Sequence, residues 1–310
     1  MENIIDFKST KLNFTEFRKT LIDGLRDICG SEFVIREEHV HKNNAKELFG
    51  VSIRNKSSNI APTIYLESFY ERYYEGKTDI EDIKNDIIRV YRQNSGSGMI
   101  NVDFFKDFER VKDKLSYRLI NYETNKRFLD EVPHRRVLDL AIIYVLNLNE
   151  CSGSITIRNE HLDLWKTDEK ELFEITESNT PKIFPFRINE FSEMLDELLE
   201  GSDAEEMNEI VRNEPVSMFI LTNNKCLYGA SAILYEDALK DFSDRIGSGF
   251  YMLPSSVHET ILLPENVCFN TENLREMVKS VNEAVLDRED YLSDNVYYYN
   301  RENKRLEIVE

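Results

Sequence analysis

Residues 215–264, PVSMFILTNNKCLYGASAILYEDALKDFSDRIGSGFYMLPSSVHETILLP, hold the densest apolar sequence of this chain and indicate its fold class. Two apolar-rich runs, at 215–224 and 229–235, are bounded by turn residues, as buried strands are. Residues 236–246 carry apolar positions at helical spacing, and residues 249–264 are typical of a long strand or a hairpin. The stretch therefore predicts strand, strand, helix and strand.

The rest of the chain continues this mixture of helices and strands. Helical spacing is found at residues 14–28, 80–91 and 271–285, and strand-like segments are found at 33–41, 47–54, 114–122, 138–147 and 295–309. This order predicts an α+β fold with antiparallel or mixed sheets and flanking helices. We expect two lobes, an N-terminal α+β domain at residues 1–185 and a C-terminal α+β domain at residues 215–310. Pro181 and Pro185 mark the boundary, and an acidic helical segment at residues 186–214 joins the lobes.

The charge balance excludes one large class of partner. The chain has 58 Asp and Glu against 39 Lys and Arg, a net charge of −19. Direct binding to DNA or RNA is disfavoured, because that affinity comes from basic side chains that neutralise phosphates. The acidity has two interpretations. It keeps the protein soluble, or it allows the protein to bind a basic groove on another protein.

Residues 190–214 concentrate this acidity, with ten acidic residues and one basic residue. Their apolar residues recur at helical spacing, so one face is apolar and the opposite face is negative. One interpretation is a solvated helical hairpin between two domains. The other is a docking segment for a protein partner. The side chains expected to bind the partner are Glu197, Glu200, Glu205 and Glu206.

Cysteine spacing and apolar runs bear on localisation. Cys29, Cys151, Cys226 and Cys268 lie far apart, so no Cys-x-x-Cys zinc or redox motif is present. The first residues lack the basic and apolar regions of a secretory signal. The longest apolar run, residues 140–146, is far shorter than the ~20 residues of a membrane span. We therefore expect a cytoplasmic protein with free thiols and no membrane partner.

The strongest candidate for chemistry is the motif PSSVHE at residues 254–259. It offers the residue types of a nucleophile, a base and an orienting acid in Ser255, Ser256, His258 and Glu259. On an extended strand, however, Ser256 and His258 share one face and Glu259 lies on the other. No Gly-x-Ser-x-Gly elbow is present. We interpret the serines as turn residues and His258 as a packing or capping residue. A hydrolase that uses Ser255 or Ser256 with His258 stays as the alternative.

Metal and nucleotide sites have weaker support. His39 and His41 lie two apart on a predicted strand, where Glu37 shares their face, and His134 or His161 could also supply a third ligand. Histidines flanked by Glu and Lys are usually solvated, so we expect no metal. No phosphate-binding loop and no Gly-x-Gly-x-x-Gly motif is present, so we expect no cofactor.

Aromatic residues suggest a second partner surface. Tyr297, Tyr298 and Tyr299 are consecutive on a predicted strand, which must expose at least one ring. Exposed tyrosine is enriched at protein interfaces, so we assign these three to partner binding. The single tryptophan, Trp165, is expected in the core.

Six ordered blocks resemble a known family. They are IAPTIYLESFYE at 60–71, VKDK at 111–114, VPH at 132–134 with DLA at 139–141, GASA at 229–232, LPSSVHE at 253–259 and LSDNVY at 292–297. The chain resembles the bacterial family known as domain of unknown function 5688. Residues 138–180 and 229–264 are more distantly similar to the YtpQ-like family. The resemblance implies an intracellular bacterial α+β protein and supplies no reaction. Asn295 stands where the family pattern has a histidine, so no role of that histidine carries over.

Acidity, tyrosine-rich segments and the lack of a complete catalytic set favour a non-catalytic protein-interaction module. One specific form is an acidic mimic that inhibits a nucleic-acid-binding or defence protein. The hydrolase is the rival, and the sequence leaves the oligomeric state open.

Overall fold

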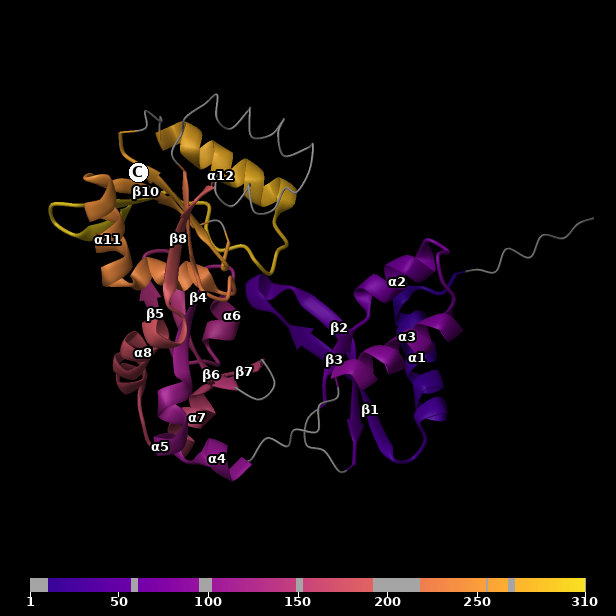
Figure 1. Cartoon of the computed structure of the whole chain (residues 1–310). Coiled ribbons are helices and arrows are strands. Elements are labelled where there is room, and N and C mark those ends of the chain that lie inside the picture. Colours follow the sequence, from indigo (N-terminus) through magenta and orange to yellow (C-terminus); the bar gives the residue numbers. More distant parts are fainter. Residues whose placement is uncertain are drawn as a thin grey trace, which may run out of the picture. The chain divides into compact units, whose positions relative to one another are not determined.

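The computed structural model describes residues 11–56, 61–94, 102–148, 153–191, 218–254, 256–266 and 271–309, and the statements below concern these residues. The chain forms two compact units. The first comprises residues 1–42 and 46–102, and the second comprises residues 43–45 and 103–310. Figure 1 shows the elements of each unit, coloured along the sequence.

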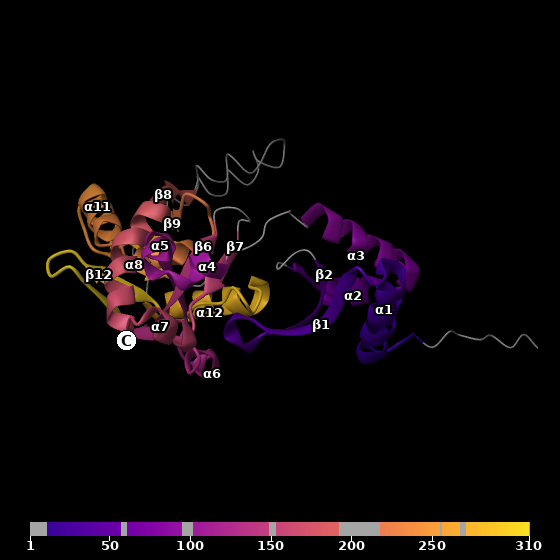
Figure 2. The same cartoon turned by 90° about the horizontal axis from the view of Figure 1, so that it is seen from below.

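The first unit is a three-stranded antiparallel sheet with helices packed against it. The sheet has the order β1-β2-β3. Its elements are α1 (Phe14–Cys29), β1 (Phe33–His41), β2 (Glu47–Asn55), β3 (Thr63–Tyr65), α2 (Glu67–Tyr74) and α3 (Ile80–Asn94). α1 begins with a capping box, because Asn13 accepts from the Glu16 N–H at 3.0 Å and Glu16 accepts from the Asn13 N–H at 3.1 Å. α1 and α3 lie beside each other (Figure 2), and their apolar faces form the core with Val51 and Ile53.

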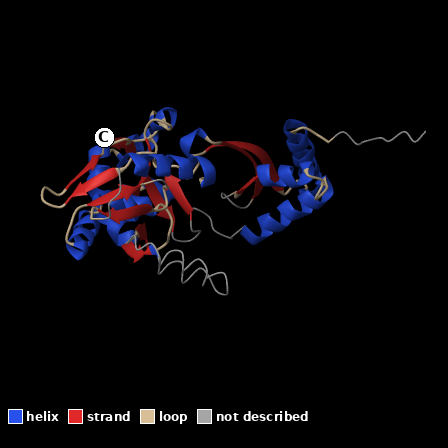
Figure 3. Ribbon diagram, turned by 90° about the horizontal axis from the view of Figure 1, so that it is seen from above, coloured by secondary structure: helices blue, strands red, loops and turns tan. Residues whose placement is uncertain are grey.

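The second unit contains two antiparallel sheets. One has the order β4-β6-β5 with β7 also paired to β6, and the other has the order β13-β12-β10-β11-β9-β8. Helices flank the strands of this unit (Figure 3). The strands are β4 (Leu115–Asn121), β5 (His134–Val137), β6 (Leu140–Leu148), β7 (Gly153–Thr156), β8 (Phe186–Glu190), β9 (Phe219–Asn223), β10 (Phe250–Leu253), β11 (Thr260–Pro264), β12 (Tyr297–Asn300) and β13 (Arg305–Ile308). The helices are α4 (Val102–Lys106), α5 (Phe108–Val111), η2 (Lys112–Lys114), α6 (Lys126–Leu129), α7 (Asn159–Trp165), α8 (Glu169–Ile183), η3 (Gly229–Leu234), α11 (Glu236–Ile246) and α12 (Thr271–Val285), with the short turn η1 (Asn43–Ala45). The predicted α+β class with antiparallel sheets is confirmed.

The two sheets of the second unit share one hydrophobic core. Buried residues of β4 and β6 pack with buried residues of β9, β10, β12 and α11. The rings of Tyr117 on β4 and Tyr235 beside α11 meet edge to face with centroids 6.3 Å apart. Trp165 is 7% exposed within this core, as expected from the sequence. Residues on both sides of the acidic stretch therefore contribute to a single core.

The two strands that flank the acidic stretch, residues 190–214, are neighbours in the same sheet. β8 pairs antiparallel with β9, with Glu190 opposite Phe219. The Phe191 N–H donates to the Met218 carbonyl at 2.8 Å. Residues 192–217, which lie outside the described residues, thus connect two neighbouring strands.

This topology changes the expected division of the chain. The sequence placed a helical linker at 186–214 between domains at 1–185 and 215–310. The compact units instead separate near residue 102, and residues 186–190 form a strand. The physical reason is that β8 and β9 complete each other's backbone hydrogen bonds, which a linker between independent domains would not do.

Two local predictions were wrong. Residues 229–234 form the 3-10 helix η3 rather than a strand. Tyr228 adopts a left-handed conformation with φ of 54°, and the Ala230 N–H bonds to the Val257 carbonyl, so the chain turns here. Pro181 does not mark a boundary, because it lies inside the last turn of α8. Proline there removes only one helical hydrogen bond near an end that already lacks partners.

Candidate functional site

The motif at residues 254–259 is the connection between two paired strands. β10 and β11 pair antiparallel, with Leu253 opposite Ile261. Ser256 forms an isolated bridge with Tyr291 and residues 257–258 bend, so they do not form the extended strand on which Ser256 and His258 would share one face. His258 is half-buried and Glu259 is exposed, while Ser255 lies outside the described residues. The Ser256 hydroxyl accepts from the His258 N–H at 3.0 Å, as expected of a turn serine.

Both ring nitrogens of His258 have partners inside the fold. Nδ1 lies 3.1 Å from the backbone nitrogen of Tyr228, and Nε2 lies 3.1 Å from Oδ1 of Asp290. A backbone N–H can only donate, so Nδ1 must accept and Nε2 must carry the proton. In this tautomer neither nitrogen is left to take a proton from a serine hydroxyl. The geometry differs from a catalytic triad, in which one nitrogen of the base faces the nucleophile.

Further hydrogen bonds tie the same turn to β9 and to the segment before β12. The Thr222 hydroxyl donates to the His258 carbonyl at 2.8 Å, and the Val257 N–H donates to the Asp290 carbonyl at 2.8 Å. Gly229 is required where these segments meet. A Cβ there would lie 2.2 Å from the Thr222 hydroxyl and 2.5 Å from the His258 carbonyl oxygen. We name the set Thr222, Tyr228, Gly229, Ser256, His258 and Asp290 the His258 clasp.

An arginine stacks on the clasp. The Arg118 guanidinium lies 3.8 Å from the centroid of the Tyr228 ring, whose centroid is 5.3 Å from the His258 ring. Burial lowers the pKa of Arg118. Its Nη2 donates to the Ser154 hydroxyl at 2.9 Å, which supplies a neutral partner for the charge. The interaction of the cation with the ring favours a fixed position for Tyr228.

A small cavity adjoins Tyr228. Its volume of about 20 Å³ suits about one water molecule. The Ser231 hydroxyl lines it and is buried without a hydrogen-bond partner among the described residues. A single water there would satisfy this hydroxyl, so the cavity has the size of a hydration site and not of a substrate pocket.

Two of the sequence blocks meet around Asp139. Its Oδ2 accepts from the Ser293 hydroxyl at 2.7 Å and from the Asn295 side-chain amide at 2.9 Å, and its Oδ1 accepts from the Tyr297 hydroxyl. Sequence reasoning gave Asp139 no role, and it named Asn295 only as a departure from the family pattern. The sequence signal that could have pointed to this contact is that residues 139–141 and 292–297 both belong to the blocks that resemble the family.

The structure separates the three tyrosines that were assigned to partner binding. On β12 the side chains alternate, so Tyr297 and Tyr299 point into the core with 0% and 4% exposure. These two are therefore core residues, and their assignment to a partner surface was wrong. Tyr298 is half-buried, and its hydroxyl donates to Glu265. Glu197, Glu200, Glu205 and Glu206 lie outside the described residues.

A cluster of metal-ligand types occurs on the first unit. His39, His41 and Glu47 are exposed, and their ligand atoms all lie within 4.8 Å of one another. Glu37, one of the three sequence-based candidates for a third ligand, instead pairs with Arg18 at 2.7 Å. His134 bonds to the Val132 carbonyl, and His161 accepts from the Arg158 N–H. Pairing His41 with the residue opposite it on the next strand would have found Glu47.

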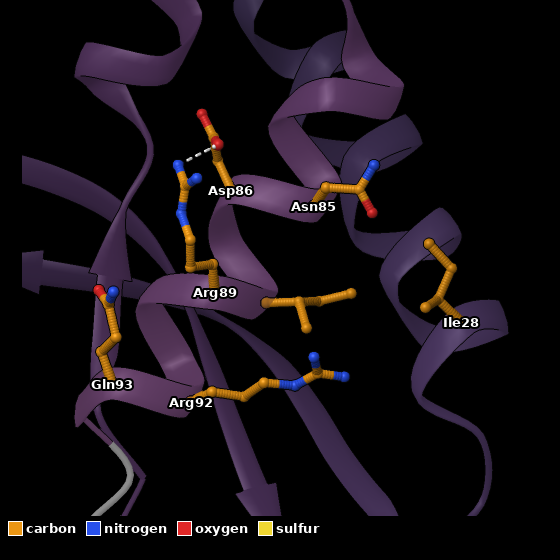
Figure 4. Close-up of a pocket in the computed structure, with 7 residues that line it drawn as sticks. Ile28, Asn85, Asp86, Arg89, Arg92 and Gln93 are labelled. Carbon is orange, nitrogen blue, oxygen red and sulfur yellow. Dashed lines mark hydrogen bonds and ion pairs between the residues drawn. The ribbon is translucent and has the colours of Figure 1, made fainter.

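A hollow of the first unit lies between α1 and α3 (Figure 4). It is open, and Ile28, Asn85 and Arg92 line it together with an ion pair in which Arg89 donates to Asp86 at 2.6 Å. Arg72 also donates to Asp86 at 2.6 Å, and this hydrogen bond lowers the pKa of that carboxyl. The acid of the hollow thus already has two cationic partners.

Comparison with known proteins gives one match. The model of a family of unknown function, DUF5688, matches residues 14–301. The chain belongs to this family. No curated protein and no solved structure matches it. The matched residues include the His258 clasp, the metal-ligand cluster and the Asp139 cluster, by which we mean Asp139 with Ser293, Asn295 and Tyr297. The family assigns no activity to any of these sites. None of the described helices is long and apolar enough to cross a bilayer.

Proposed function

We propose that this DUF5688 chain is a cytoplasmic, non-catalytic protein-interaction module that binds a basic partner through the acidic stretch between β8 and β9. The observation that carries the proposal is the pairing of Glu190 with Phe219. Neighbouring antiparallel strands need a connection of only about two to five residues. Here the connection is far longer and strongly acidic, although the two strands already meet at its base.

The distribution of charge supports the same assignment. Residues 1–102 contain 15 Lys and Arg against 16 Asp and Glu, so residues 103–310 hold 24 against 42. Nearly all of the net charge thus belongs to the second unit. Residues 190–214 alone contribute ten acids and one base. Long connections of this kind are usually either binding segments or disordered ones.

The partner that fits this chemistry is a protein with a basic groove. Opposite charge speeds association and sets orientation more than it raises affinity. A groove that normally holds nucleic acid is one such surface, which makes an inhibitor by acidic mimicry a specific form of the proposal. Glu197, Glu200, Glu205 and Glu206 are the side chains proposed to make the contact, with Tyr298 as the remaining tyrosine candidate.

The experiment uses a fluorescent arginine-rich peptide as a defined basic probe. We expect the association rate with the full chain to fall steeply as salt rises, because exposed charges act over only about 8 Å at physiological ionic strength. Replacing Glu197, Glu200, Glu205 and Glu206 with Gln should lower the association rate more than it raises the dissociation rate.

The control removes the same charge from four exposed positions elsewhere in the second unit. These positions are Glu276, Glu283, Glu302 and Glu307, each replaced with Gln. If the two quadruple variants associate equally slowly, net charge alone acts and the acidic stretch is not the binding segment. A rate that ignores salt removes the electrostatic proposal altogether.

The hydrolase alternative has less support from the geometry. Nδ1 of His258 accepts from the Tyr228 N–H, and Nε2 donates to Asp290. The Ser256 hydroxyl accepts from the His258 N–H. A serine nucleophile needs a base within hydrogen-bond reach of its hydroxyl. Labelling of Ser255 or Ser256 by a fluorophosphonate probe in the wild type, and its loss in His258→Ala, would establish the hydrolase instead.

A further inference from the structure

We propose that His39, His41 and Glu47 form a binding site for a divalent transition-metal ion of the zinc class on the first unit. The proposal is independent of the acidic stretch. β1 and β2 pair antiparallel, with His41 directly opposite Glu47 and His39 opposite Phe49. His39 and His41 share one face of β1 because they are two residues apart. The pairing adds Glu47 to that face.

The ligand atoms already lie close to a coordinating arrangement. Nε2 of His39 is 3.2 Å from Oε2 of Glu47, and Nδ1 of His41 is 3.7 Å from Oε1 of Glu47. Zinc binds nitrogen and oxygen at about 2.0–2.2 Å, so ligands in a tetrahedral shell lie about 3.3 Å apart. Small rotations of side chains therefore suffice, and the backbone of the hairpin need not move.

Packing fixes one of the ligands. The His39 ring stacks on the Phe49 ring, with centroids 4.4 Å apart and planes within 2°. The Arg18 guanidinium lies 3.7 Å from the centroid of the same phenylalanine ring. A stacked imidazole loses less rotational freedom on binding an ion, which favours binding. Lys42, which follows His41, places its ammonium 4.8 Å from the centroid of the Tyr65 ring.

The donor set defines the class of ion. Two imidazoles and one carboxylate bind zinc in catalytic sites that leave a fourth position for water, and the same set suits other first-row metals. The side chains of His39, His41 and Glu47 are 43%, 63% and 55% exposed, so an ion can reach them from solvent. The sequence offered Glu37, His134 or His161 as the third ligand, and we expected no metal because histidines flanked by Glu and Lys are usually solvated. The structure substitutes Glu47, which reaches both rings.

The test titrates the metal-free full chain with Zn²⁺ by calorimetry and with Co²⁺ by visible absorption. We expect one equivalent to bind and the Co²⁺ spectrum to show ligand-field bands of nitrogen and oxygen coordination. His41→Ala, Glu47→Gln and His39→Phe should each weaken binding at least about tenfold, because losing even an outer partner of a ligand costs that much. His39→Phe keeps an aromatic ring on Phe49.

Glu37→Gln is the matched control, because it removes a carboxylate from the same face of the same strand. Its affinity for Zn²⁺ should equal that of the wild type. Circular dichroism should show that all variants keep the wild-type fold. The proposal is overturned if the wild type shows no saturable binding. It is also overturned if Glu47→Gln binds as the wild type does, or if Glu37→Gln weakens binding while Glu47→Gln does not.

Discussion

Nε2 of His258 lies 3.1 Å from Oδ1 of Asp290, although 32 positions separate the two residues in the chain. The same ring accepts the Tyr228 amide at Nδ1. The imidazole therefore joins the β10–β11 turn to the turn that precedes η3 and to the segment that precedes β12. We regard His258 as a structural cross-link of the second unit.

His258→Ala should lower the free energy of unfolding by about 1–3 kcal/mol, because it leaves the Tyr228 amide and Asp290 without their partner. His258→Gln should cost less, since its amide group can accept and donate. Urea unfolding followed by circular dichroism measures both values. An unchanged stability in His258→Ala, together with loss of a measured activity, would assign the residue to catalysis.

Asp139→Ala should destabilise the second unit more than Tyr297→Phe does. The carboxylate accepts from Ser293, Asn295 and Tyr297, so its removal leaves three donors without an acceptor. Each buried group left unpaired costs about 1–3 kcal/mol. Tyr297→Phe removes one donor and keeps the ring in the core. Equal effects in chemical unfolding would show that the cluster contributes nothing beyond the Tyr297 contact.

Stability should fall at alkaline pH because the fold raises the pKa of several tyrosine hydroxyls. Burial raises the pKa of Tyr297, and the charge of Asp139 raises it further. Burial also raises the pKa of Tyr144, and its hydrogen bond to Glu169 adds to this. Burial and the charge of Asp294 raise the pKa of Tyr291 to about 12.

For each of these groups the folded pKa exceeds the unfolded value of 10.0, so the fold favours the neutral phenol. Their contribution to stability is complete below about pH 10 and is lost as the pH rises above it. We expect urea midpoints to fall above about pH 10, with phenolate absorbance appearing as the protein unfolds. Phenolate formation by these residues at pH 10 in a still-folded chain would contradict this.

Cleavage inside residues 192–217 should not separate the fragments that it produces. β8 and β9 lie on opposite sides of the cut, yet they pair and share a sheet. After limited proteolysis near Gly201, we expect the fragments to co-elute in size-exclusion chromatography and to separate only in denaturant. Immediate separation under native conditions would indicate a linker between independent domains.

Replacing residues 192–217 with a short Asn-Gly turn should leave the fold intact. Shortening a loop reduces the entropy cost of closing it, and each halving of its length is worth about 0.6 kcal/mol. The free energy of unfolding should therefore stay the same or rise slightly. Binding of the basic peptide probe should fall, which separates the role of this stretch in binding from any role in folding. A variant that fails to fold would show that the stretch is part of the core.

The sequence by itself determined most elements and the fold class of this protein. Helices α1, α3 and α12 and strands β1, β2, β4 and β6 lie where apolar spacing predicted them. This is because the periods of helices and strands are local properties of the chain. The caps of α1 and α8 are local as well, because Asn13 and Asp168 each accept from the backbone N–H three residues further on. The burial of Trp165 followed from its size and apolar character.

Only the tertiary structure decided which distant segments meet. Asp290 reached His258, Asp139 reached Ser293, and Glu190 came to face Phe219 through contacts that have no fixed spacing in sequence. The 3-10 turn at Gly229 likewise depends on the close approach of Thr222 and the His258 carbonyl. Strand pairing and side-chain hydrogen bonds are chosen by the whole fold, which must satisfy its buried polar groups together. The local sequence pattern therefore predicted the helices and strands. The shared core and its hydrogen bonds determined the His258 clasp, the Asp139 cluster and the position of the acidic stretch between β8 and β9.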